Sequence, residues 1–231
     1  MEMEHLPNEL KNRIKDYTIF KPNTKEELEN AIDIWCEDRE EAINQYGHIS
    51  NWDTSLITDM SYLFYDKSYF NDNINNWNVS NVTNMMNMFE YAFIFNQPLN
   101  NWNVSNVQNM IGMFSGARLF DESLNNWNVS NVTNTRYMFS HAINFNKPLN
   151  KWNTINIKDM SGMFSTAVSF NQPLNNWNVS NVENMTSMFN KSYKFNQQLN
   201  NWDISNVNHI QNIFKNALSF DKKNALWYNE D

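Results

Sequence analysis

The side chains with the strongest potential for metal or covalent chemistry in this 231-residue sequence are four histidines and one cysteine. His5, His48, His141 and His209 occupy unrelated positions of a 25-residue repeat, so stacking the repeats would not gather them as metal ligands. Cys36 falls on the apolar face of a predicted helix, which favours a buried structural thiol over a nucleophile. We therefore expect no metal and no cofactor.

Paired carboxylates, which carry acid and base catalysis in hydrolases, recur at two positions of the repeat. Asp53 and Asp203 share one position and Asp59 and Asp159 share another, but each pair lies four or more repeats apart. This separation excludes a catalytic pair. The chain also has no Gly-rich phosphate loop, because its only glycines are Gly47, Gly112, Gly116 and Gly162. We expect a protein that is not an enzyme.

Tryptophan recurs at 25-residue intervals, and this periodicity predicts a stacked-repeat architecture. Its positions are Trp52, Trp77, Trp102, Trp127, Trp152, Trp177, Trp202 and Trp227. Phenylalanine recurs twice in each unit in the same register, without insertion or deletion. Because one unit is too short to bury its own apolar face, we expect the units to stack, with indole on indole and phenyl ring on phenyl ring.

The apolar spacing changes halfway through the unit 99–123. Leu99, Trp102 and Val104 fall at i, i+3 and i+5, and the last step has the period of a strand. From Val107 onward the apolar residues fall at i, i+3, i+6 or i+7 and i+10, which is typical of one helix face. The pattern predicts an α/β fold, a right-handed solenoid of 25-residue strand-helix coils, leucine-rich-repeat-like, with a helical N-terminal cap.

Two columns of asparagine are predicted to bind the main chain. One follows the second Phe of each unit and is expected to adopt left-handed backbone and to bond its own main chain: Asn71, Asn96, Asp121, Asn146, Asn171, Asn196 and Asp221. The other is expected to form a ladder between stacked coils: Asn81, Asn106, Asn131, Asn156, Asn181 and Asn206. Leu56 takes the ladder position in the first coil, which indicates that the cap is its neighbour.

Three regions follow from the repeat. Residues 1–48 are predicted to be an acidic helical cap, residues 49–223 seven full repeats, and residues 224–231 a truncated eighth repeat that closes the array. Within the cap, Thr24 and Glu27 predict a capping box at the start of a helix. The apolar face of that helix runs from Leu28 to Ile43 and includes Cys36.

The charge of the chain argues against nucleic acid as a partner. The net charge is −8, and residues 1–48, with twelve acidic and six basic side chains, hold −6 of it. The remaining array is nearly neutral and has no basic stripe to attract phosphates. No apolar stretch approaches a membrane span, and no secretion signal begins the sequence, so we expect no membrane association and a cytoplasmic protein.

Variation between repeats indicates where a partner could be recognised. The outward positions equivalent to residues 101, 103 and 105 are nearly uniform, whereas the segment after them differs from coil to coil. The candidate partner-binding surface consists of Tyr65, Lys67, Glu90, Tyr91, Arg118, His141, Lys191, Tyr193 and Lys194. We expect an unknown protein to bind this edge. End-to-end self-association through the C-terminal coil, residues 225–228, is a further expectation.

The unit F-N-Q-P-L-N-N-W-N-V-S-N-V-x-N-M-x-x-M-F, at 95–114 and again at 170–189, resembles the BspA-like leucine-rich-repeat family. This is the mycoplasma-lipoprotein-type repeat domain of unknown function, and the resemblance covers residues 20–228. Its bacterial members look like secreted adhesion proteins. Without their signal or lipid-attachment cysteine, this chain is more similar to an intracellular or large-DNA-virus member, in the host cytoplasm or the virion.

Two other functions stay open at the level of sequence. Leu6-Pro7-Asn8-Glu9-Leu10 with Ile14 is similar to the opening of an F-box, which would make the chain a ubiquitin-ligase substrate adaptor. A carbohydrate-active solenoid enzyme is the second alternative. It would need a carboxylate cluster on adjacent coils, and the sequence offers none.

Overall fold

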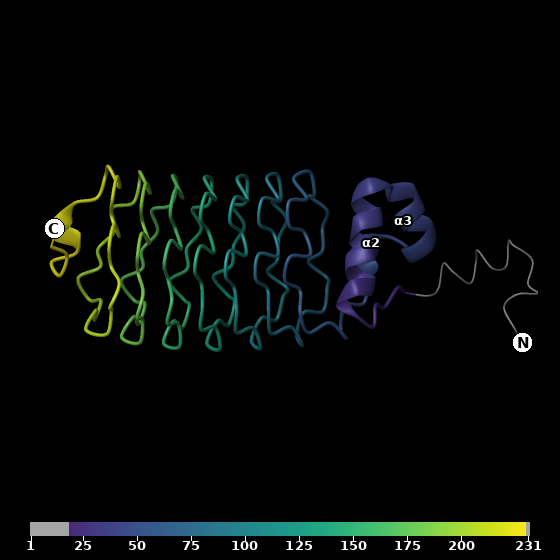
Figure 1. The fold of residues 1–231 in the computed structure, drawn as a ribbon, viewed down its shortest axis with the longest axis horizontal. Coiled ribbons are helices and arrows are strands. Elements are labelled where there is room, and N and C mark those ends of the chain that lie inside the picture. The colour runs from purple at the N-terminus through teal and green to yellow at the C-terminus, as the bar shows by residue number, and fades with distance from the viewer. Residues whose placement is uncertain (1–18, 230–231) are drawn as a thin grey trace, which may run out of the picture.

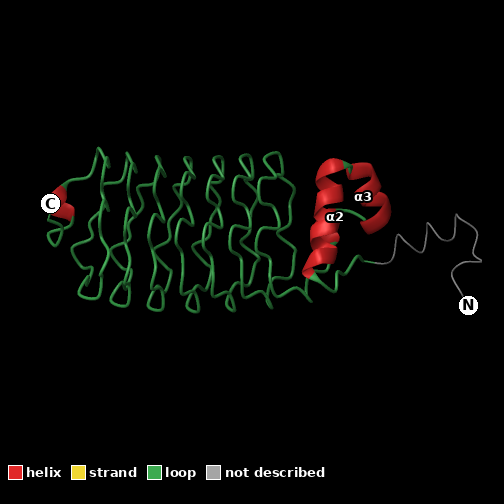
Figure 2. Cartoon of the chain, viewed as in Figure 1, coloured by secondary structure: helices red, strands yellow, loops and turns green. Residues whose placement is uncertain are grey.

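The computed structural model describes residues 19–229, which form a row of stacked coils with a helical cap at the N-terminal end (Figure 1). Two α-helices make the cap, α2 (Lys25–Glu37) and α3 (Arg39–Tyr46). The short 3-10 helices η2 (Ile49–Asn51) and η3 (Lys222–Asn224) lie at the two ends of the coils. Figure 2 shows that the coils between them contain neither helices nor strands.

The predicted strand-helix coil is therefore wrong, and with it the α/β, leucine-rich-repeat-like fold. Each coil is a series of turns in which an N–H donates to the carbonyl three residues earlier. In the third coil the pairs are Trp102 to Leu99, Val107 to Val104, Met113 to Met110, Ser115 to Gly112, Ala117 to Phe114 and Phe120 to Ala117. Most of these bonds join two apolar residues. The i, i+3 spacing that predicted a helix face comes from consecutive turns.

Left-handed backbone prevents the turns from continuing as an α-helix. Two positions in each coil, those equivalent to Tyr62 and Asp66, have positive φ in all seven coils, with values from 54° to 71°. In the third coil these positions are Gly112 and Gly116. An α-helix requires negative φ at every residue, so two left-handed residues four positions apart in each coil break it.

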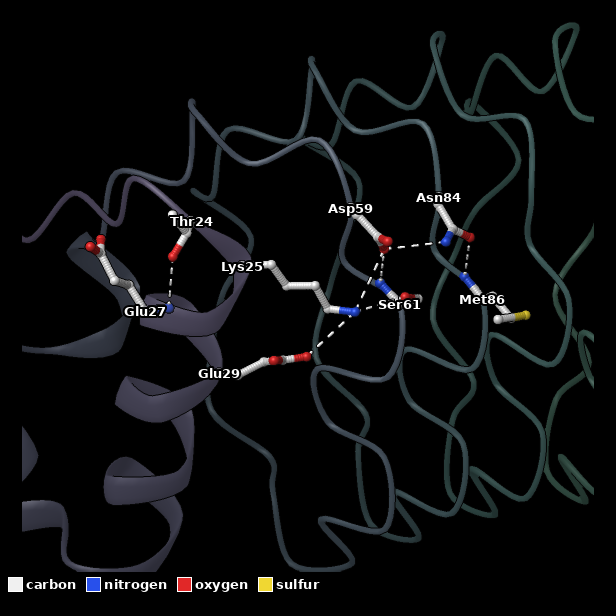
Figure 3. A network of polar contacts seen from close by, with 8 residues as sticks. All are labelled: Thr24, Lys25, Glu27, Glu29, Asp59, Ser61, Asn84 and Met86. Atoms are coloured by element: carbon white, nitrogen blue, oxygen red, sulfur yellow. Dashed lines mark hydrogen bonds and ion pairs between the residues drawn. The ribbon is translucent and has the colours of Figure 1, made fainter.

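The coils are joined by backbone hydrogen bonds that do not make a regular sheet. The N–H groups of Met85, Asn87, Phe89 and Tyr91 donate to carbonyls of the next coil at 2.7–2.9 Å. In a regular parallel ladder, a donating residue also accepts from the same neighbouring strand. Here the intervening N–H of Met86 turns back to Asn84 Oδ1 at 3.2 Å (Figure 3). Only single parallel bridges form, such as Asn84 to Asn109.

The aromatic columns of the core are confirmed. Trp102 stacks on Trp127 at 6.3 Å between ring centroids, and Phe89 stacks on Phe114 at 5.5 Å. These rings are at most 4 % exposed. The indole Nε1 of Trp102 donates to the carbonyl of Ile74 at 3.1 Å. Trp52 donates to the carbonyl of Gly47 instead. The bond to the carbonyl 28 residues earlier recurs at Trp77, Trp127, Trp152, Trp177 and Trp202. The stacks therefore satisfy the polar atom of each indole while burying its ring.

One asparagine column behaves as predicted and the other does not. The ladder is confirmed, because Asn106 Nδ2 donates to the carbonyl of Ser80 at 2.7 Å and its equivalents do the same. In the column after the second Phe, only Asp221 bonds nearby main chain among the described residues, where its Oδ1 accepts from the N–H of Lys223 at 2.9 Å. Asn96 Oδ1 instead accepts from the N–H of Asp121 in the next coil at 2.9 Å, and none of this column has left-handed backbone.

The cap packs α2 against the first coil. Thr24 is the N-cap of α2 and its hydroxyl accepts from the N–H of Glu27 at 3.1 Å, whereas Glu27 accepts from Asn23. Lys25 Nζ lies 2.8 Å from Ser61 Oγ and 3.8 Å from Asp59 Oδ1 (Figure 3). Buried Leu28, Ala31, Ile32 and Trp35 cover the open side of the coil. The cap therefore supplies both apolar cover and polar contacts to the coils.

Two details of the predicted cap helix are corrected. Asp38 ends α2 and begins α3, so the apolar face does not continue to Ile43, which is 44 % exposed. Cys36 is exposed and not buried. Desolvation by neighbouring atoms nevertheless raises the pKa of its thiol to about 11, so the thiolate is scarce at neutral pH. The first part of the predicted cap, residues 1–18, lies outside the described residues.

Candidate functional site

The candidate surface follows one edge of the stack. All nine predicted residues belong to the segment equivalent to residues 65–69, repeated in successive coils. This segment contains the second left-handed residue of each coil, the one equivalent to Asp66. It leads to the second Phe of the core. Neighbouring coils place equivalent residues side by side, so side chains that lie 25 residues apart in sequence become neighbours on this edge.

An aromatic strip, defined as Tyr62, Tyr65, Tyr91 and Phe93, lies along the first two coils of this edge. The rings meet edge to face, with centroids 5.8 Å apart for Tyr62 and Tyr65, 6.0 Å for Tyr65 and Tyr91, and 6.2 Å for Tyr91 and Phe93. The three tyrosines are 41–44 % exposed. Such contacts hold each ring in place while leaving part of it accessible to another molecule.

Glycine in the third coil makes room for the strip. A Cβ atom on Gly116 would stand 2.6 Å from Cδ1 of Tyr91, so the ring lies against backbone that carries no side chain. The guanidinium of Arg118 lies 4.6 Å from the ring centroid of Phe93, within the range of a cation-π contact. Arg118 thus extends the strip into the third coil.

The strip ends at a shallow hollow of about 300 Å³. Its lining consists of Tyr91, Phe93, Gly116, Arg118, His141 and Ile143. Desolvation lowers the pKa of His141, and the positive charges of Lys191 and Arg118 lower it further. Ser140 Oγ lies 2.9 Å from His141 Nδ1. At neutral pH the hollow therefore presents an uncharged imidazole beside a permanently charged guanidinium.

The structure brings Tyr65, Tyr91, Arg118 and His141 together, but it does not join all nine predicted residues. Lys67 pairs with Asp33 of α2 at 2.6 Å and so holds the cap on the first coil. A second cluster, Lys191, Tyr193 and Lys194, lies on the sixth coil, two coils beyond His141. Glu90 is half-buried, and desolvation raises the pKa of its carboxyl group while a hydrogen bond to Ser115 opposes the shift.

Sequence reasoning missed three members of this site, Tyr62, Phe93 and Ile143. Tyr62 and Ile143 are exposed at the surface, and Phe93 is partly exposed. Each occupies a column whose residue differs from coil to coil, which is the signal that identified the other residues. Phe93 and Ile143 share the column of the predicted residues Arg118 and Tyr193.

The groups with potential chemistry are dispersed among the described residues. Asp59 and Asp159 belong to one column of bridges, with three coils between them. No cluster of three or more metal-binding side chains is found between residues 19 and 229.

Within the same residues, no helix has the length and apolar character needed to cross a bilayer. The F-box-like residues 6–14 lie outside the described residues.

Stacked coils of one length, with a repeated aromatic core and a varied edge, define a repeat protein. The chain belongs to the family described as Mycoplasma protein of unknown function, DUF285, which matches residues 37–151 and again residues 119–227. This agrees with the resemblance to a mycoplasma-type repeat, and it does not bear on a viral or intracellular source. No curated protein and no solved structure matches the chain.

Proposed function

We propose that this chain is a non-catalytic repeat protein that binds a protein partner along the edge formed by the aromatic strip, Arg118 and His141. The observation that carries the proposal is the continuity of the strip, in which partly exposed rings and a stacked guanidinium cross three coils. Tyrosine and arginine are the residue types that most often dominate binding energy at protein interfaces. Fixed rings also lose little conformational entropy on binding.

The shape of the site supports a protein surface more than a small molecule. The hollow beside His141 is shallow, and its lining comes from three adjacent coils. An enclosed pocket would bury most of a small ligand. A long, slightly hollowed edge fits a partner that contacts several coils, with one side chain of the partner entering the hollow.

The test is capture of the partner by three forms of the chain. Tyr91→Ala, Arg118→Ala and Tyr193→Ala are combined in one variant, and a matched variant carries Asn101→Ala, Gln108→Ala and Asn201→Ala at exposed positions outside this edge. A partner retained by the wild type is identified by mass spectrometry, purified, and titrated by calorimetry. We expect the first variant to bind at least about tenfold more weakly, because interface hot spots contribute about 2 kcal/mol or more.

The matched variant should bind like the wild type. Equal affinity of all three forms for the partner, with unchanged thermal unfolding, would refute binding at this edge.

A further inference from the structure

Among residues 19–229, no further coil packs on the outer side of the seventh coil. Ile204, Val207 and Ile210 are partly exposed, although the equivalent Val179, Val182 and Met185 of the preceding coil are at most 1 % exposed. Residues 224–229 cover only part of this coil, where Trp227 stacks on Trp202 at 6.2 Å. We name residues 204–218 the C-terminal edge.

Four backbone N–H groups of the C-terminal edge have no acceptor in the described part of the chain. In the sixth coil the equivalent N–H groups, those of Met185, Ser187, Phe189 and Lys191, donate to the next coil at 2.7–2.9 Å. The N–H groups of Ile210, Asn212, Phe214 and Asn216 meet no acceptor among residues 19–229. They form a row of donors on one side of the chain, flanked by the carbonyls of Asn208 and Leu218. Backbone donors of this kind favour an anionic or carbonyl partner.

The side chains around the row of donors add positive charge to the partial positive charge of the N–H groups. The C-terminal edge, residues 204–218, contains Lys215 and no acidic residue, and residues 191–231 together have a net charge of +1, from five lysines, three aspartates and one glutamate. Lys215 lies within the row of donors, and Lys223 lies in η3. Both side chains are exposed. The C-terminal edge is therefore a positive, partly apolar surface.

The opposite end of the molecule is complementary in charge. Residues 19–48 contain eight acidic and three basic side chains, a net charge of −5. Helix α3 lies on the side of α2 that faces away from the coils (Figure 1). It presents exposed Glu40 and Glu41 in its first turn and exposed Ile43. Carboxylates there can accept from N–H groups, and Ile43 offers apolar contact for an edge that exposes Leu218 and Leu226.

We propose that the C-terminal edge is a docking site for the acidic outer face of the cap of a second copy, so that molecules join head to tail. Two C-terminal edges do not satisfy each other, because the same segment of a second copy presents N–H groups where acceptors are needed. The contact joins two different surfaces and leaves one of each free, so it builds open chains of molecules and not a closed dimer. It lies at the ends of the stack and leaves the aromatic strip accessible.

The full chain is tested first by sedimentation velocity and light scattering. The average mass is expected to rise above 27.5 kDa as protein concentration rises. It should return to the monomer value in about 1 M salt, where charges are screened beyond about 3 Å. Amide exchange of Ile210, Asn212, Phe214 and Asn216 should slow as the mass rises. A monomer at every concentration in low salt would overturn the proposal.

Charge-reversed variants then identify the two surfaces. The cap variant carries Glu40→Lys and Glu41→Lys. The tail variant, in which tail means the C-terminal edge together with η3, carries Lys215→Glu and Lys223→Glu. Far-UV circular dichroism and thermal unfolding check that each variant is folded. Each variant alone is expected to associate at least tenfold more weakly than the wild type. An equal mixture should stop at a heterodimer, because the intact tail of one variant meets the intact cap of the other.

Two results would contradict head-to-tail docking. A cap variant that still dimerises by itself would indicate contact between two tails. A mixture that contains only monomers, when the wild type associates under the same conditions, would show that these two surfaces do not meet.

Discussion

At the scale of single residues, left-handed backbone decides where the candidate site can form. Tyr91, His141 and Lys191 all occupy the column equivalent to Asp66, with φ of 57–59°. Positive φ is uncommon for such residues and is often a sign of function. Here it recurs in every coil, so its cause is the geometry of the repeat and not the site. The glycines of this column and its partner column are the residues that fit without strain.

Gly116→Ala tests whether glycine fits the left-handed position without strain, and whether it makes room for the ring of Tyr91. We expect the substitution to cost about 1 kcal/mol, because alanine is strained at a φ of 71°. The new Cβ should also push the exposed ring of Tyr91 away from the hollow. The free energy of unfolding from urea titration and the ring contacts of Tyr91 by NMR are the measurements.

Gly47→Ala is the control for Gly116→Ala. Gly47 has a φ of 70°, and a Cβ there would meet no atom within 4 Å. It should lose a similar stability and leave Tyr91 unmoved. An unchanged Tyr91 ring in Gly116→Ala would mean that glycine is not what makes room for it.

At the scale of the element, the coil is held by its neighbours and not by its own hydrogen bonds. Each coil makes short turns internally and donates four N–H groups to the next coil from the segment equivalent to residues 85–91. The asparagine ladder adds a side-chain bond at each interface. A regular strand does not form because the N–H groups between the donors turn back within the coil. Met86 donates to Asn84 Oδ1, and Met88 and Glu90 donate to the carbonyls three residues earlier.

The ladder predicts that Asn131→Asp destabilises the chain more than Asn131→Ala. Asn131 Nδ2 donates to the carbonyl of Ser105 at 2.7 Å. Alanine removes this bond, at a cost of about 1 kcal/mol. Aspartate also places a carboxylate oxygen against a carbonyl oxygen, which adds repulsion. Thermal unfolding measures both, with Asn101→Ala as a control at an exposed asparagine outside the ladder. Equal stability of the two Asn131 variants at neutral pH would contradict the role of the donor.

At the scale of the whole molecule, stability is shared among nearly identical interfaces. Indole, phenyl and asparagine columns run through the stack in the same 25-residue register. A repeat array of this kind gains stability coil by coil, and its ends need protection. The cap covers the first coil, whereas residues 224–229 cover only part of the last coil. The two ends are therefore chemically different, which gives the stack a direction.

Deletion of residues 99–123 should leave a folded but less stable protein. The deletion joins Pro98 to Leu124, which follows the equivalent residue in the next unit, so every column stays in register. Deletion of residues 99–111 removes half a coil and breaks every column, so that variant should not fold. Tryptophan fluorescence and cooperative thermal unfolding distinguish the two outcomes. A half-coil deletion as cooperative as the whole-coil deletion would argue against a register shared by all coils.

The stacking follows from the spacing of residues alone, because the identical spacing of Trp102 and its equivalents places like side chains above one another. The sequence also predicted the burial of these rings, the asparagine ladder, and a helix beginning at Thr24. These features depend on the period of the chain and on local side-chain chemistry. The variable edge could be located in the same way, although apolar members such as Phe93 were missed.

The internal build of each coil, and the choice of variable residues that meet, depend on the folded backbone. A spacing of three is shared by helix faces and by consecutive turns, and apolar pattern alone does not separate them. The available signal was the placement of Gly112, Gly116 and Gly162 in two columns that also hold Asn87 and Asn212, residues tolerant of left-handed backbone. The free donors of the C-terminal edge depend on which way each N–H points, and that direction is set by the backbone of the folded stack.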